Sequence, residues 1–285
     1  MEEIRLPNYD AKLTIFAKDA KEVFDWTFDF YDIKGIHERG YFGEGETIAI
    51  LDTGLNEKHP DLFGTVIHAE DMRGSNDVTD RNYHSTWIHG RLSAVHNGVG
   101  VQGICPKAKI IILKVFNDNG SGNSEWLEKG IRRARELGAT QINFSGGLGV
   151  KIPSIEEAIN DFILDGGTFW AANGNDGLKN DLDFPSNIPQ TVAVGSHDEN
   201  GSISNFSDFG AMSDIYSAGE DVLSTYGDKD YALLSGTSMA TPTALGVFAT
   251  LRIPLEKKLG FKITPANLHL FAQDIKSINV KERRF

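Results

Sequence analysis

Short apolar runs alternate with helix-like segments through the middle of this chain of 285 residues. The runs typical of β-strands are 47–51, 110–115, 141–145, 168–172 and 192–196. Between them, apolar residues recur at helical spacing over 126–137 and 155–163. This alternation predicts an α/β fold of three layers, a parallel central sheet with helices on both faces. Thr264-Pro265 predicts the start of a last helix.

We find no internal repeat and no linker, and therefore expect a single domain over residues 1–285, with an N-terminal extension over roughly 1–40. The net charge of −12 argues against nucleic acid and anionic membranes as partners. No stretch approaches the ~18 apolar residues of a membrane span. The acidic segment 1–7 is unlike a signal peptide, and the single Cys105 excludes an internal disulfide. We expect a cytoplasmic protein.

Ser238 stands among small residues in the segment 236–242, just ahead of an apolar run that is typical of a buried helix. A helix N-terminus offers unpaired N–H groups and the positive end of the helix dipole, which stabilise a developing negative charge. This placement makes Ser238 a candidate nucleophile. A helix-capping hydroxyl is the alternative interpretation of the same position.

Asp52 follows the apolar run 47–51, so it is expected at the carboxyl end of a parallel strand, where α/β sheets hold their active sites. An ordinary turn aspartate is the alternative. His84 opens a helix-like segment and can act as a general base near neutral pH. The chain has eight histidines, and any one of them is more often a surface or core residue. The histidine alone therefore does not identify a base.

The order Asp52, His84, Ser238 along the chain is the order of the subtilisin triad. Over roughly residues 40 to 275 the chain resembles the subtilisin-like serine proteases (subtilases). The segment around Asp52, with 59–62, and the segment 236–242 match two family motifs closely. The resemblance implies a subtilisin-like fold and a serine endopeptidase in which Ser238 attacks the scissile carbonyl, His84 is the base and Asp52 orients it.

The histidine motif departs from the family pattern. Thr86 and Gly90 fix its register on His84, but the residues between and beside them differ from those of the family, which makes His89 a rival for the role of base. Thr243 also stands where the family usually has histidine. These departures keep open a catalytically inactive subtilase that acts as a binding module.

The resemblance also assigns residues to substrate binding. Asn175 is implied as the side-chain donor to the oxyanion, with help from Thr237. The substrate is expected to lie extended between two backbone segments and along a pocket wall, a form of strand addition. The positions that match these segments, each of which could also be a plain turn or strand end, are Asn119, Gly120, Ser121, Gly122, Ser145, Gly146, Gly147 and Ala172.

Alignment on two prolines, Pro185 and Pro189, places Asp183 at the floor of the pocket for the residue before the cut, where many relatives have glycine. A carboxylate there favours Arg or Lys through charge-assisted hydrogen bonds. The resemblance therefore predicts cleavage after a basic residue. A solvated, aspartate-rich loop is the alternative interpretation of this segment.

The family resemblance implies no cofactor for the chemistry and a structural calcium ion. Its ligands are expected to be the side chains of Asp61 and Asn97 and the carbonyls of Val95, Val99 and Val101. The family's usual ligand from the N-terminal segment cannot be placed in this sequence.

Few residues precede the Asp52 strand, which indicates the intracellular subtilases rather than exported members with a long pro-domain. Two groups fit. Cytoplasmic peptidases that remove lantibiotic leader peptides often cut after arginine, and Asp183 and the loosened histidine motif favour this group, with a lantibiotic precursor as partner. Intracellular degradative subtilisins carry a short N-terminal extension that can lie across the active site, often with a Leu-Ile-Pro-Tyr motif, which 4–9 resembles only loosely.

Overall fold

A computed structural model describes residues 1–14, 21–264 and 267 of the chain. Its centre is a sheet of seven strands in the order β10-β9-β8-β7-β3-β5-β4. Every neighbouring pair in this sheet is parallel. The strands are β3 (Thr47–Asp52), β4 (Val66–Asp71), β5 (Lys109–Lys114), β7 (Gln141–Phe144), β8 (Thr168–Ala172), β9 (Val192–His197) and β10 (Ile215–Ala218).

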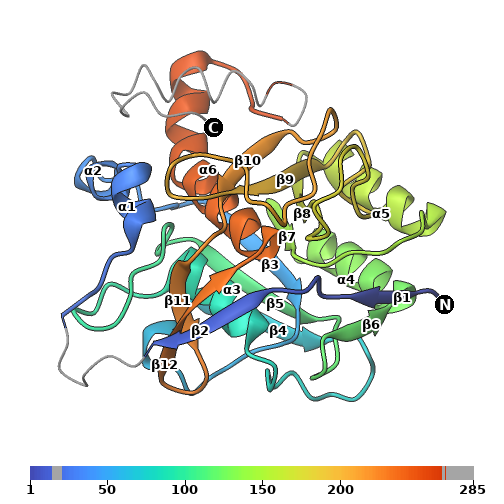
Figure 1. Ribbon diagram of the computed structural model, residues 1–285, viewed down its shortest axis with the longest axis horizontal. Helices are drawn as coiled ribbons and strands as arrows, with labels where there is room; N and C mark the ends of the chain where they lie inside the picture. The colour runs from blue at the N-terminus through green and yellow to red at the C-terminus, as the bar shows by residue number, and fades with distance from the viewer. Residues whose placement is uncertain (15–20, 265–266, 268–285) are drawn as a thin grey trace.

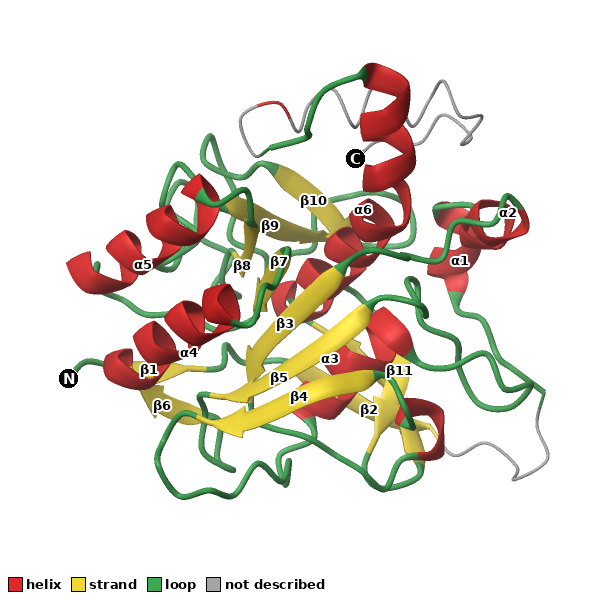
Figure 2. Ribbon diagram, turned by 180° about the vertical axis from the view of Figure 1, so that it is seen from behind, coloured by secondary structure: helices red, strands yellow, loops and turns green. Residues whose placement is uncertain are grey.

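Helices cover both faces of the sheet (Figure 2). One face carries α3 (His84–Ser93) and α6 (Thr237–Leu259), and the other carries α4 (Ser124–Glu136) and α5 (Pro153–Leu164). Each face has its own apolar core, the first around Trp87, Trp170 and Phe248 and the second around Phe144 and Phe162. The expected three-layer α/β fold is confirmed. The short helices α1 (Trp26–Phe30), α2 (Ile33–Glu38) and the 3-10 helix η1 (Pro60–Leu62) lie outside these layers.

Two small antiparallel sheets join segments that are far apart in the sequence. In the first, β1 (Glu3–Arg5) pairs with β6 (Ser121–Asn123). In the second, β12 (Asp230–Ser235) lies between β11 (Val222–Tyr226) and β2 (Asp10–Thr14). Figure 1 shows β1 and β2, both dark blue, crossing the molecule as one extended path. The N-terminal segment therefore bridges the two small sheets.

The five expected strands lie within one or two residues of their predicted bounds, as β3, β5, β7, β8 and β9. The edge strands β4 and β10 were not predicted, because neither is a continuous apolar run. The helix expected from Thr264-Pro265 lies mostly outside the described residues. Within the described ranges, no helix is both long enough and apolar enough to cross a membrane.

Candidate active site

The three residues of the predicted triad lie at the ends of three elements. Asp52 is the last residue of β3, His84 is the first residue of α3, and Ser238 is the second residue of α6. The carboxyl ends of parallel strands share one edge of a sheet, and the helices that follow begin at that edge. The fold therefore gathers these positions although they are far apart in the sequence.

Asp52 and His84 form a fully buried pair. Nδ1 of His84 lies 3.0 Å from both carboxylate oxygens of Asp52, and neither side chain is exposed. The rival histidine, His89, instead bonds through Nε2 to the Thr65 hydroxyl at 2.7 Å, and burial lowers its pKa to about 3. The structure thus pairs Asp52 with His84 and not with His89.

A buried carboxylate, Asp80, links the two elements that carry this pair. It accepts hydrogen bonds from the Tyr83 N–H at 2.9 Å, the Thr86 N–H at 2.8 Å and the Thr53 hydroxyl at 2.8 Å. The Thr53 hydroxyl accepts in turn from the Ser85 N–H at 3.0 Å. Asp80 therefore satisfies the first turn of α3 and fixes it to the loop that follows Asp52.

A buried cation, Lys114, lies beneath the same loops. It is the register partner of Asp52 in the sheet, and its ammonium group donates to the Thr53 and Thr79 carbonyls and to Asp118. Burial raises the pKa of Asp80, and the hydrogen bonds from Thr86, Tyr83 and Thr53 oppose that rise. The sequence analysis missed both residues. Asp80 could have been found, because a carboxylate just before a helix start is a recognisable capping pattern.

The Ser238 hydroxyl is not hydrogen-bonded to Nε2 of His84 in this structure. It donates to the Ser145 carbonyl at 2.9 Å, and the Ser145 hydroxyl donates back to the Ser238 carbonyl at 3.0 Å. Nε2 of His84 is buried and has no hydrogen-bond partner among the described residues. The third pairwise contact of the triad is therefore not made in this state, which is common before a substrate tightens such a site.

Asn175 points its side-chain amide at a backbone carbonyl of the same chain. Its Nδ2 donates to the Asn8 carbonyl oxygen at 2.6 Å. The N–H and the hydroxyl of Thr237 both donate to Oδ1 of Asn175, at 2.9 and 2.8 Å. In this structure the Thr237 hydroxyl orients Asn175, and its help to the oxyanion stays a prediction.

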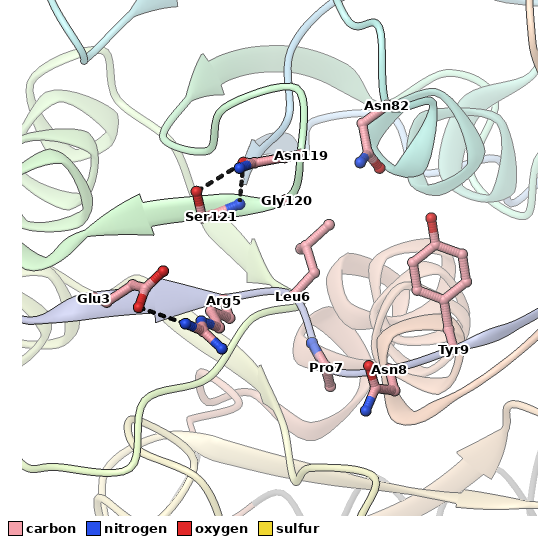
Figure 3. A pocket seen from close by; sticks show the side chains of 10 residues that line it. All are labelled: Glu3, Arg5, Leu6, Pro7, Asn8, Tyr9, Asn82, Asn119, Gly120 and Ser121. Atoms are coloured by element: carbon pink, nitrogen blue, oxygen red, sulfur yellow. Dashed lines mark hydrogen bonds and ion pairs between the residues drawn. The ribbon is translucent and has the colours of Figure 1, made fainter.

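The N-terminal segment fills the predicted substrate groove. Arg5 exchanges two backbone hydrogen bonds with Gly147, at 3.1 and 2.9 Å, and the Leu6 N–H donates to the Gly120 carbonyl at 3.0 Å. The ring of Tyr9 lies 5.1 Å from that of His84. Figure 3 shows this segment lining one pocket together with Asn82, Asn119 and Ser121, a cavity of about 490 Å³.

The remaining predicted wall residues lie along this segment. Oδ1 of Asn119 accepts from the N–H and hydroxyl of Ser121, at 3.0 and 2.7 Å, and Gly122 pairs with Ile4. Gly146 packs so closely on two phenyl rings that a Cβ would collide with them, and Ala172 ends β8. The structure places residues 119–122 against residues 3–9, whose weak motif did not reveal their place in the site.

Asp183 lies between the two walls of the groove. A Cβ on either Gly147 or Gly174 would collide with or crowd its carboxylate. Together with Leu6 and Pro7, Asp183 lines a cavity of about 300 Å³. Burial, followed by the charges of neighbouring aspartates, raises the pKa of Asp183 to about 7.

One of those aspartates, Asp208, was not found by the sequence analysis. It is buried, and its carboxylate also lies against Gly174. Its Oδ1 accepts from the Leu178 N–H at 2.6 Å, so it also holds the loop above the pocket. No sequence pattern separates it from a solvent-exposed loop aspartate.

The predicted calcium ligands meet at the loop after α3. The side-chain amide of Asn97 lies 3.0 Å from Oδ1 of Asp61, and the Val101 N–H donates to Oδ2 at 3.0 Å. The Val95 N–H donates to the Asp61 carbonyl at 2.8 Å. The Val99 N–H donates to Oδ1 of Asn97 at 3.0 Å. The five residues thus share one small region.

A second carboxylate reaches this loop from the N-terminal segment. The Gly98 N–H donates to Oε1 of Glu22 at 3.0 Å, and His96 lies 3.1 Å from Oε2. Two carboxylates, one amide and a loop of carbonyls are a donor set that calcium takes. The chemistry of these donors is therefore that of a calcium site, in which Glu22 would be the N-terminal ligand that the sequence analysis could not place.

Comparison with known proteins identifies the family of the chain. Residues 43–269 match the model of the Subtilase family. The chain is 34% identical to M-protease of Shouchella clausii over 243 residues, which cover 85% of this chain and 62% of that protein. Subtilisin Savinase of Lederbergia lenta is 34% identical over 80% of this chain and 83% of its own length.

The major intracellular serine protease of Bacillus subtilis is 33% identical over 84% of this chain and 77% of its own length. The chain thus spans about 62% of the length of M-protease and a larger share of the other two. From the family match and these identities, the chain belongs to the Subtilase family.

Proposed function

We propose that the protein is a serine endopeptidase. The observation that carries the proposal is the buried Asp52–His84 pair together with a peptide carbonyl, that of Asn8, held by the Asn175 amide. A substrate carbonyl in that place would meet a nucleophile at the start of α6 and a neutral donor aimed at its oxygen.

The chemistry is acyl transfer. Ser238 Oγ leaves the Ser145 carbonyl, bonds to the scissile carbonyl carbon and passes its proton to Nε2 of His84. The Asn175 side-chain amide and the Ser238 N–H stabilise the developing negative charge by donating hydrogen bonds to the oxyanion. His84 then protonates the leaving amine, which breaks the C–N bond, while Asp52 holds the imidazole in its tautomer. Water then attacks the acyl carbon and passes its proton to Nε2 of His84. His84 returns the proton to Oγ of Ser238 as the C–O bond breaks, which releases the acyl group.

A fluorophosphonate probe tests this assignment, because it labels only an activated serine. The wild-type chain is expected to be labelled and Ser238→Ala to remain unlabelled. Ser202→Ala, which removes an exposed serine, is the matched control and should label like the wild type. An unlabelled wild-type chain that still binds peptides would instead support the inactive binding module.

Asp183 supports a preference for substrates with Arg or Lys before the cut bond, since its carboxylate lines the cavity between Gly147 and Gly174. The proposed role is the removal of a lantibiotic leader peptide by one cut after a basic residue. A precursor peptide digested by the protein should give one cleavage, read by mass spectrometry. Preference for a peptide with Phe before the cut would overturn the basic specificity.

A degradative intracellular subtilisin is the second candidate. The occupied groove favours it, because residues 3–9 lie where a substrate would and would limit activity until they are displaced. The same digest separates the two roles, since a degradative enzyme hydrolyses unfolded proteins at many sites.

The proposed location is the cytoplasm, and the proposed partner is a peptide or protein substrate rather than nucleic acid or membrane. The net charge of −12 and the single, buried Cys105 support this. For the metal, the proposal is a calcium ion held by Asp61, Glu22 and Asn97 with carbonyls of Val95, Val99 and Val101. Such an ion would stabilise the loop after α3 and take no part in the reaction.

A further inference from the structure

The turn over residues 116–122, called the groove turn below, forms one wall of the predicted substrate groove. It is closed by an antiparallel bridge between Phe116 and Gly122. The Gly120 carbonyl accepts from the Leu6 N–H at 3.0 Å, and β6, which begins within the turn, pairs with β1. The position of a peptide in the groove therefore depends on the position of this turn.

Asp118, a residue of the groove turn, contacts a buried cation. Its Oδ1 accepts from Nζ of Lys114 at 2.7 Å, and the Lys114 side chain is fully buried, whereas that of Asp118 is 42% exposed. Partial burial raises the pKa of Asp118, but the hydrogen bond and the charge of Lys114 outweigh it and hold that pKa below its ordinary value. The carboxylate is therefore charged at neutral pH.

The other two contacts of the Lys114 ammonium lie on the segments that carry the predicted catalytic pair. It donates to the carbonyl of Thr53, which directly follows Asp52, and to the carbonyl of Thr79, in the loop that precedes α3 and His84. An ammonium has three N–H donors, so these two carbonyls and Asp118 use all of them. One buried group thus joins the groove turn to both catalytic segments.

Further contacts hold the groove turn against the loop that precedes α3. Nδ2 of Asn82 donates to the Asp118 carbonyl at 3.0 Å, and a guanidinium nitrogen of Arg81 lies 3.4 Å from Oδ2 of Asp118. Arg73 donates to Oδ1 of Asn117 at 3.3 Å. Residues 117–121 are Asn-Asp-Asn-Gly-Ser, so no apolar side chain anchors the tip of the turn. Its polar contacts therefore decide where it lies.

We propose that Asp118 is a positioning residue, which holds the groove turn in place relative to Asp52 and His84 so that a bound peptide is presented to them. It acts through Lys114 and the loop before α3 and not on the reacting atoms. This inference rests on the proposed endopeptidase function and adds a residue that sets the geometry of its groove.

The test compares two quenched fluorescent peptides that share the bond to be cut and the leaving half. One begins a single residue before that bond and the other about six residues before it, so that only the longer peptide reaches the groove turn. In the wild type the longer peptide should have a kcat/KM about tenfold higher, because additional backbone hydrogen bonds form. Both peptides must displace the N-terminal segment, so the ratio of the two kcat/KM values isolates the contribution of the groove turn.

Asp118→Ala removes the contact with Lys114 and should lower this ratio from about tenfold to about twofold, with the loss for the longer peptide appearing as a higher KM. Asp118→Asn should keep most of the ratio, because its amide oxygen can still accept from Lys114. Asp228→Ala is the matched control. It removes a carboxylate that is also 42% exposed and also paired with a lysine, Lys58, and it should keep the wild-type ratio.

A wild-type ratio in Asp118→Ala, or an equal loss of kcat/KM for both peptides, would overturn the positioning role and leave the endopeptidase function in place. If the wild type hydrolyses neither peptide, the endopeptidase function is overturned and this inference with it.

Discussion

Asp183 is the residue on which the proposed preference for basic substrates depends. Its pKa of about 7, raised by burial, means that the carboxyl is neutral below that pH and charged above it. The ratio of kcat/KM for an Arg peptide to that for a matched Leu peptide should rise about tenfold between about pH 6 and pH 8. In Asp183→Asn the ratio should be low and flat, and a flat ratio in the wild type would contradict this role.

Asp80 is expected to act on the reaction through the position of α3. Asp80→Asn loses part of the hydrogen bonding that joins Thr53, Tyr83 and Thr86. A small displacement of His84 relative to Ser238 would then lower kcat by about 10²-fold, with KM nearly unchanged. Asp77→Asn, in the same loop but with a side chain that is 41% exposed, should keep both constants. An unchanged kcat in Asp80→Asn would refute the positioning role.

At the scale of elements, Arg91 of α3 connects three parts of the fold. This buried side chain donates to Thr243 of α6 at 3.0 Å, to Thr27, and to Asp25 at 3.4 Å. At position 243, where the family usually has histidine, this chain has a threonine that accepts a hydrogen bond from the buried Arg91. Thr243, which suggested a catalytically inactive subtilase, is therefore explained by this contact with Arg91.

Arg91→Ala should therefore destabilise the whole chain. The substitution leaves Asp25 buried without its cation, and the free energy of unfolding should fall by about 3–5 kcal/mol. Denaturant unfolding measures this change. The exposed Arg135→Ala, which breaks only surface ion pairs, should cost about 1 kcal/mol or less. Equal losses in the two variants would show that the buried network adds nothing.

The sequence predicted those elements whose local pattern decides their structure. β3 and β8 are buried on both faces, so each is a continuous apolar run that can be recognised without its neighbours. β1, β2 and β12 could not be found in this way. Their pairing joins segments more than a hundred residues apart, and it depends on which backbone edges the finished fold leaves free.

The candidate site divides in the same way. Asp52, His84 and Ser238 stand in motifs that mark them, whereas Lys114 and Asp208 are recognised only by what surrounds them in space. For Thr237 the sequence shows a hydroxyl beside the site but not which atom that hydroxyl contacts, which is Oδ1 of Asn175.

At the scale of the whole molecule, the loop after α3 ties the N-terminal segment to the main domain through Glu22 and Asp61. If calcium binds there, a chelator should lower Tm by about 5 °C relative to saturating calcium, because an ion bound only by the folded chain stabilises it. Glu22→Gln should shrink this difference, and Glu44→Gln, an exposed carboxylate elsewhere, should not. A Tm that is unchanged by both calcium and chelator would rule out a bound calcium ion.

The most direct measurement is kcat for peptide hydrolysis in Ser238→Ala, in His84→Ala and in the double variant. If the two side chains act as one unit, each single change should remove about 10⁶-fold, the size known for the subtilisin triad, and the double variant should lose no more. Losses that multiply in the double variant, or a His84→Ala variant that retains wild-type turnover, would contradict the proposed active site.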